Sequence, residues 1–160
     1  MKDDTLFSQE EMDAMLEGIA QGATVGDVIN MSQEAIEAGY GLAYSLYTAG
    51  NYKDAETMFR ALCVYDHTDQ RFWMGLGGCR QMNGDVRGAI DAYGFGAYAS
   101  ALGDPAPLVH GALCCLKLGD KEDAKGLFTA ALDLGEADNS EHAAYRARAR
   151  AMLDMLGKEA

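Results

Sequence analysis

The 160 residues include 25 acidic and 13 basic side chains, a formal net charge of -12, and 49% of them are hydrophobic. This charge would repel a phosphate backbone, which argues against nucleic acid as a partner, and the hydrophobic content excludes wholesale disorder. No apolar run approaches the roughly 20 residues that span a bilayer, and the acidic start is not that of a signal peptide. We therefore expect one folded domain over 1–160, located in the cytoplasm and not inserted in membranes.

The first predicted element is a helix that begins after Ser8, because Ser8 and Glu11 have the spacing of a capping box. A short apolar piece at 25–31 follows, and Ser32 then caps the next helix. Residues 1–35 thus form a helical extension ahead of the repeats described below. The apolar stripe of the first helix consists of Met12, Met15, Leu16 and Ile19.

Residues 36–138 contain an internal repeat marked by the frame G-[N/D]-x-x-x-A. It begins at Gly50, Gly84 and Gly119, which are 34 and 35 residues apart. A glycine between two helical segments at a period of about 34 residues resembles the tetratricopeptide repeat. Each glycine suits the left-handed end of a first helix, and the Asn or Asp after it can accept amide hydrogen bonds at the start of the second. The sequence predicts an all-α fold, with three such repeats in a right-handed superhelix.

A glycine-rich stretch, GLGGCRQ at 75–81, falls in the first helix of the second repeat. Trp73, Leu76 and Gly77 match the W-x-x-L-G of the repeat consensus, in which a small residue lets two helices approach closely. We interpret the glycines as a packing seam. A phosphate-binding loop is not expected, because G-x-x-x-x-G-K-[ST] is absent and Arg80 stands where G-x-G-x-x-G needs its last glycine.

The last predicted element is a capping helix within 139–160 that begins at Asn139 or Ser140. Arg146, Arg148 and Arg150 are expected to face solvent. An apolar stripe should cover the open edge of the third repeat. It consists of Tyr145, Ala149, Met152, Leu153 and Leu156.

The register of the repeats predicts which residues face a concave groove. Tyrosines on one helical face suit pockets for apolar side chains, while their hydroxyls can bond to a peptide backbone. The alternative is that these tyrosines are core residues that pack against the preceding segment. Gly78 would leave room for a bound chain. In repeat order the predicted residues are Glu37, Tyr40, Tyr44 and Tyr47; Arg71, Met74, Gly78 and Gln81; and Ala106, Val109, Leu113 and Leu116.

The predicted groove is aromatic at one end and aliphatic at the other. Some tetratricopeptide domains clamp a C-terminal carboxylate with Lys, Arg and Asn side chains, but none of these stands at the matching positions here. A ligand selected by its terminus is therefore not expected. The matching positions hold Tyr40, Tyr44, Gly75, Ala106 and His110.

Longer motifs cover most of the chain: GATxxDV at 22–28, AETMFRALCVYDH at 55–67, MGLGGCRQ at 74–81, and the stretch 89–96. The most diagnostic is F-x-x-L-C-x-x-D, which begins at Phe59. On these motifs the chain resembles the class II chaperones of bacterial type III secretion, which hold the two hydrophobic translocator proteins before export. A general tetratricopeptide adaptor for another peptide or protein is the alternative.

This resemblance implies that the concave groove takes an extended translocator segment with spaced Pro and Leu side chains. It also implies a homodimer formed through the N-terminal helix, and hence through Met12, Met15, Leu16 and Ile19. The repeat register adds Gln81 and Val109 to the groove residues implied by the family. Those residues are Tyr40, Tyr44, Tyr47, Tyr52, Phe59, His67, Arg71, Met74, Gly78 and Met82.

No residue pattern predicts an enzyme, a cofactor or a metal site. The four cysteines include no C-x-x-C pair and fall in apolar helical patterns, so buried thiols are expected. His110 with Cys114 and Cys115 would supply too few ligands for zinc. His67 lies near Asp66 and Asp69 in a turn, where polar capping is the expected role.

Overall fold

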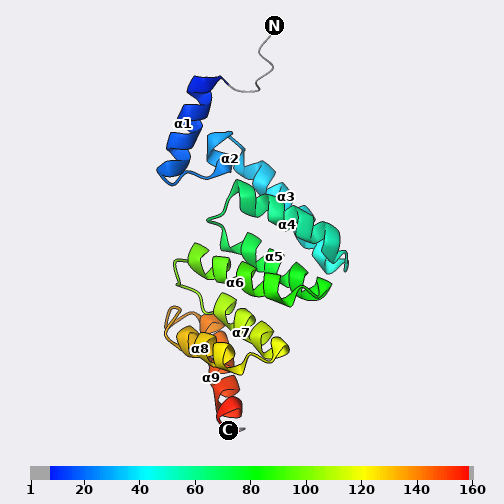
Figure 1. The fold of residues 1–160 in the computed structure, drawn as a ribbon, viewed down its shortest axis with the longest axis vertical. Helices are drawn as coiled ribbons and strands as arrows, with labels where there is room; N and C mark the ends of the chain where they lie inside the picture. The colour runs from blue at the N-terminus through cyan, green and yellow to red at the C-terminus, as the bar shows by residue number, and fades with distance from the viewer. Residues whose placement is uncertain (1–7, 159–160) are drawn as a thin grey trace.

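The computed structural model describes residues 8–158, and every regular element in that range is a helix (Figure 1). The prediction of an all-α fold is confirmed. The helices are α1 Gln9–Ala20, α2 Val25–Val28, α3 Gln33–Thr48, α4 Tyr52–Tyr65, α5 Gln70–Asn83, α6 Val86–Ala99, α7 Ala106–Leu118, α8 Lys121–Leu132 and α9 Ser140–Lys158.

Helices α3 to α8 form three helix–turn–helix pairs stacked along the long axis of the molecule (Figure 1). Each helix packs mainly on the helices before and after it in the chain. The buried side chains accordingly form clusters along the stack, around Phe59 and Phe72, around Tyr93, and around Phe128. This nearest-neighbour organisation is typical of repeat proteins.

The turn glycines adopt the predicted conformation. Gly50, Gly84 and Gly119 have φ of 80°, 89° and 83°, in the left-handed region that favours glycine. The expected side-chain caps form at only one of the three turns. Asp85 accepts from the Gly88 N–H at 2.9 Å, whereas Asn51 and Asp120 make no capping bond. The prediction is wrong for those two, since a left-handed turn can end one helix without side-chain capping of the next.

The glycines of 75–81 lie inside α5, where they form a packing seam as predicted. A Cβ atom on Gly77 would lie 2.5 Å from Cε1 of the buried Tyr93 ring, and one on Gly75 would overlap the ring of Phe59. Only a residue without a side chain lets these rings approach α5 so closely. The sequence GLGGCRQ therefore reflects helix packing.

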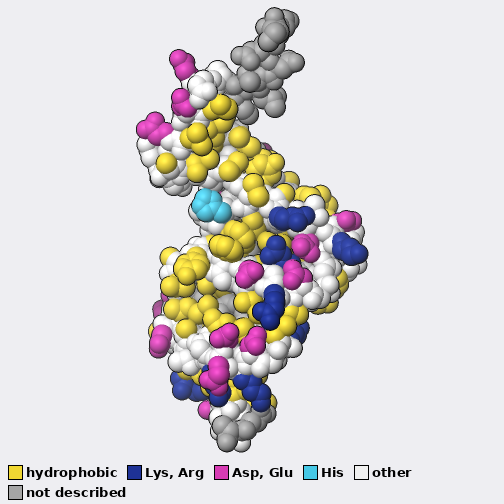
Figure 2. All heavy atoms as spheres, in the orientation of Figure 1, with side chains coloured by type: hydrophobic (Ala, Val, Ile, Leu, Met, Phe, Trp, Pro, Cys, Tyr) yellow, Lys and Arg dark blue, Asp and Glu magenta, His cyan; other side chains and the backbone are white. Residues whose placement is uncertain are grey.

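The N-terminal helix α1 stands apart from the stack. Its capping box is confirmed, with the Ser8 N–H donating to Glu11 at 2.8 Å and the Glu11 N–H donating to Ser8 Oγ at 3.3 Å. None of its residues is buried, and it packs on the short helix α2. Leu16 is 66% exposed, and Figure 2 shows hydrophobic side chains gathered over this part of the surface. Within residues 8–158 no helix is long and apolar enough to cross a membrane.

The C-terminal helix α9 packs on α8 and α7, and its predicted apolar stripe joins the buried cluster around Phe128. The expectation that three arginines face solvent is wrong for Arg146. Its guanidinium donates to the carbonyl oxygens of Leu134 and Glu136, at 2.9 and 3.3 Å, because the loop before α9 folds back over the helix. Arg148 and Arg150 are exposed.

Candidate peptide-binding groove

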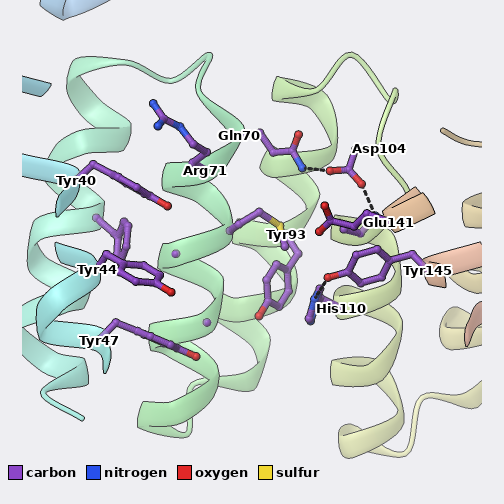
Figure 3. A pocket seen from close by; sticks show the side chains of 15 residues that line it. Tyr40, Tyr44, Tyr47, Gln70, Arg71, Tyr93, Asp104, His110, Glu141 and Tyr145 are labelled. Carbon is purple, nitrogen blue, oxygen red and sulfur yellow. Dashed lines mark hydrogen bonds between the residues drawn. The ribbon is translucent and has the colours of Figure 1, made fainter. Parts of the chain in front are cut away.

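A cavity of about 480 Å³ opens on one side of the stack (Figure 3). Side chains from α3, α5, α7 and α9 line it, with Phe59 of α4 and Tyr93 of α6 at its base. Eight residues predicted from the sequence are among those that line it: Tyr40, Tyr44, Tyr47, Phe59, Arg71, Met74, Gly78 and Ala106.

One wall of the groove is a row of tyrosines on a single face of α3, and all three rings point toward the cavity (Figure 3). The Tyr40 and Tyr44 rings stack with centroids 6.2 Å apart. Tyr44 is 55% exposed, so it is not a core residue. Tyr40 also contacts the buried rings of Phe59 and Phe72, at 6.1 and 5.9 Å between centroids, and so serves both the core and the wall.

Two residues of α5 shape the opposite side. Gly78 has no side chain, and a Cβ atom there would lie 3.3 Å from the Tyr47 ring. The missing side chain lets the Tyr47 ring lie close to the backbone of α5, so this ring takes up part of the room that Gly78 was expected to leave for a bound chain. Met74 supplies a flexible apolar surface beside it.

Arg71 closes the rim between α3 and α5. Its guanidinium donates to Glu37 and Asp69, both at 2.6 Å, and lies 4.8 Å from the centroid of the Tyr40 ring. Hydrogen bonds from Arg71 lower the pKa of Glu37. The cation is therefore neutralised by its own neighbours and held in place.

Val109 is a correction to the predicted site. Its side chain is completely buried in the cluster that contains Ala149 and Leu156 of α9, so it does not face the groove. The groove wall in the third repeat is formed by Ala106 and His110. The predicted aliphatic end is wrong, because α9 folds over the third repeat and contributes polar and aromatic side chains instead.

This end of the groove combines stacked rings with carboxylates. The His110 ring stacks on Tyr93 at 5.3 Å, and its Nε2 lies 3.4 Å from the Tyr145 hydroxyl. Burial lowers the pKa of His110, and the charge of Arg148 lowers it further. Asp104 accepts from Gln70 Nε2 at 2.5 Å and from the Ala106 N–H at 2.8 Å. None of these contacts was predicted.

Comparison with known proteins identifies the family. Residues 34–69 match the tetratricopeptide repeat model. Low calcium response locus protein H of Yersinia pestis is 36% identical over 157 residues, which are 98% of this chain and 92% of that protein. The type III secretion translocator chaperone SycD of Yersinia enterocolitica has 36% identity and a TM-score of 0.76 over 84% of this chain and 98% of that one. This chain belongs to the type III secretion translocator chaperones.

A third relative carries a ligand. PcrH of Pseudomonas aeruginosa, solved in complex with the chaperone-binding region of PopD, is 38% identical to this chaperone. The two structures agree with a TM-score of 0.74 over 81% of this chain and 96% of that one.

The other predicted groove residues of this chaperone lie outside the cavity. The Tyr52 ring packs on Tyr47 at 5.3 Å, and Gln81 accepts from the Tyr93 hydroxyl at 3.1 Å. Met82 is 52% exposed. His67 lines a separate hollow on the surface, beside Trp73, Phe95 and Tyr98.

The cysteines of the chaperone are free and buried, and burial raises the pKa of Cys63 to about 12 and that of Cys79 to about 11. No group of three or more His, Cys, Asp or Glu residues with metal-site geometry occurs in the described part of the chain. Asp66 caps the turn by accepting from the N–H and hydroxyl of Thr68.

Proposed function

We propose that this chaperone holds an extended segment of a hydrophobic translocator protein in its groove before export. The observation that carries the proposal is the tyrosine wall of α3, which lines the cavity and leaves Tyr44 55% exposed. Such rings accept apolar side chains while their hydroxyls remain free for backbone hydrogen bonds. The complex of the related PcrH with the chaperone-binding region of PopD supports the same use of this fold.

The rest of the molecule suits a chaperone without catalytic activity, cofactor or metal that works in the cytoplasm. A translocator segment destined for a membrane would aggregate if left exposed. A partner with a net charge of -12 keeps the complex dispersed by repulsion between copies. Release at the secretion machine requires moderate affinity, with a dissociation constant of about micromolar to nanomolar, or roughly −8 to −12 kcal/mol.

The proposed contacts divide into two groups. Tyr40, Tyr44, Tyr47, Met74 and Gly78 form the binding surface itself, whereas Arg71 and Phe59 support it from the rim and the base. A ligand longer than the cavity would also reach residues outside it. These are Tyr52, His67, Gln81 and Met82.

We also propose that the chaperone forms a homodimer through α1. Met12, Leu16 and Ile19 are 41%, 66% and 45% exposed along one helix, and Met15 lines a cleft between α1 and α2. A helix with an apolar stripe and no buried residue gains stability by packing on another surface. A second copy of the chain supplies that surface.

The groove is tested by fluorescence anisotropy with a labelled peptide that spans the chaperone-binding region of PopD. Wild type should bind it saturably, and Tyr44→Ala should weaken binding by about 1–3 kcal/mol, as expected for an aromatic anchor. Leu42→Ala is the matched control, because Leu42 is 52% exposed on the same helix α3 and does not line the groove. Its affinity should equal that of wild type.

Amidation of the peptide C-terminus should leave the affinity unchanged, since the segment is read internally. Absence of saturable binding, or equal binding by wild type and Tyr44→Ala, would contradict the proposal. Loss of binding on amidation would instead assign the protein to adaptors that select a free carboxylate terminus.

A further inference from the structure

One carboxylate in the groove, that of Glu141, has no partner among residues 8–158. Glu141 lies in the first turn of α9, and its side chain points into the cavity toward the side of Tyr93 and Tyr145 (Figure 3). Its backbone N–H donates to Asn139 Oδ1 at 3.0 Å. Within residues 8–158 no hydrogen bond or ion pair reaches its carboxylate.

The groove offers this carboxylate no counter-charge. Asp104 lines the same end, but its oxygens already accept from Gln70 and Ala106, and one of them lies 3.9 Å from His142 Nε2. His110 is neutral at physiological pH because burial opposes its protonation. Arg71, the cation that lines the cavity, is committed to Glu37 and Asp69 at the other end.

The arginines of α9 near this end lie outside the cavity, and Arg146 donates to the carbonyl oxygens of Leu134 and Glu136. Arg148 follows Glu141 by two helical turns on α9, is exposed, and makes no ion pair with it. The α9 end of the groove therefore carries net negative charge next to aromatic rings. Such a site is complementary to a long basic side chain, whose stem packs on a ring while its head reaches a carboxylate.

We propose that the α9 end of the groove receives a Lys or Arg side chain of the client, with Glu141 as its acceptor and the Tyr145 ring against its stem. This inference rests on the proposed function of the groove. Glu141 is then a specificity-determining residue, because an acidic client residue at the same place is disfavoured by like charge. The tyrosine wall selects apolar side chains, and Glu141 selects the charge of a residue beside them.

The test is a charge scan of the labelled PopD peptide. Each residue is replaced in turn by Lys, Gln or Glu, and binding is measured with wild type, Glu141→Gln and Glu141→Lys. At one position or two adjacent ones, Lys should bind wild type about twofold to fivefold more tightly than Gln, as for an exposed ion pair. Glu141→Gln should abolish this gain, and Glu141→Lys should prefer Glu at the same place.

Asp154→Asn is the matched control. It removes one negative charge from an exposed site at the other end of α9, so it should keep the full preference for Lys. Equal affinities for Lys and Gln at every position, with Tyr44→Ala still weakening all peptides, would overturn the inference and leave the groove function intact. A Lys preference that survives in Glu141→Gln would attribute it to overall charge and also overturn the inference. Failure of the parent peptide to bind would overturn both.

Discussion

Substitution of Gly77 by alanine tests the packing seam of α5 directly. The added Cβ atom would lie 2.5, 2.7 and 2.9 Å from three atoms of the Tyr93 ring. Carbon atoms pack at about 3.5–4.0 Å, so the ring would have to retreat by about 1 Å. It has no space to do so, because Tyr93 is 3% exposed, its ring stacks on His110, and its hydroxyl is bonded to Gln81.

The expected loss of stability follows from two opposing effects. Overpacking a rigid core position costs about 3 kcal/mol, at the upper end of the usual range, while replacing a helical glycine by alanine returns about 1 kcal/mol. We therefore expect Gly77→Ala to lower the free energy of unfolding by about 2 kcal/mol. For a chain of this size the melting temperature should fall by about 4–8 °C.

The assay is urea unfolding followed by circular dichroism at one protein concentration, so that self-association is equal in all samples. Gly126→Ala is the matched control, since Gly126 lies inside α8 and a Cβ atom there would meet no heavy atom within 4 Å. That variant should gain up to about 1 kcal/mol. If Gly77→Ala were as stable as Gly126→Ala, the seam would not be tightly packed and the reasoning would be refuted.

Three further predictions concern other parts of the chain. Because burial lowers the pKa of His110, the unfolded chain binds a proton at higher pH than the folded one, so stability should fall as pH drops below about 6.5. In a plot of the urea midpoint against pH, His110→Gln should reduce this fall, and an unchanged slope would contradict the prediction. Val109→Ala should lower the free energy of unfolding by about 2 kcal/mol. The folded variant should still bind the PopD peptide like wild type, since Val109 is buried. Weaker peptide binding by a folded variant would instead indicate that Val109 contacts the ligand. Leu16→Glu should leave the fold intact and reduce the mass measured by light scattering, and an unchanged mass would remove α1 from the dimer interface.

The repeats were predictable because their signals are local. A left-handed glycine ends a helix through its own backbone conformation, and Gly50, Gly84 and Gly119 mark three turns whatever surrounds them. The tyrosine wall was predictable for the same reason, since helical periodicity alone places Tyr40, Tyr44 and Tyr47 on one face.

In the third repeat, helical periodicity did not predict every groove residue correctly. The register treats its first helix as open on the concave side, but α9 covers that side, burying Val109 and bringing Glu141 and Tyr145 into the groove. The predicted stripe of α9 contained part of the signal, because Glu141 precedes Tyr145 by one helical turn. The direction in which α9 crosses α7 depends on long-range packing, which periodicity within one helix does not encode.

The placement of the groove across the stack affects how the molecule responds when filled. Its walls come from α3, α5, α7 and α9, although α3 and α9 share no extended contact of their own. In a stack where each layer depends on its neighbours, the ends open more readily than the centre. A segment lying along the groove would connect the first layer to the last and suppress this fraying at both ends together. Hydrogen exchange of the backbone amides would then slow in α3 and in α9 together. A bound client segment would thus stabilise both ends of the chaperone that holds it.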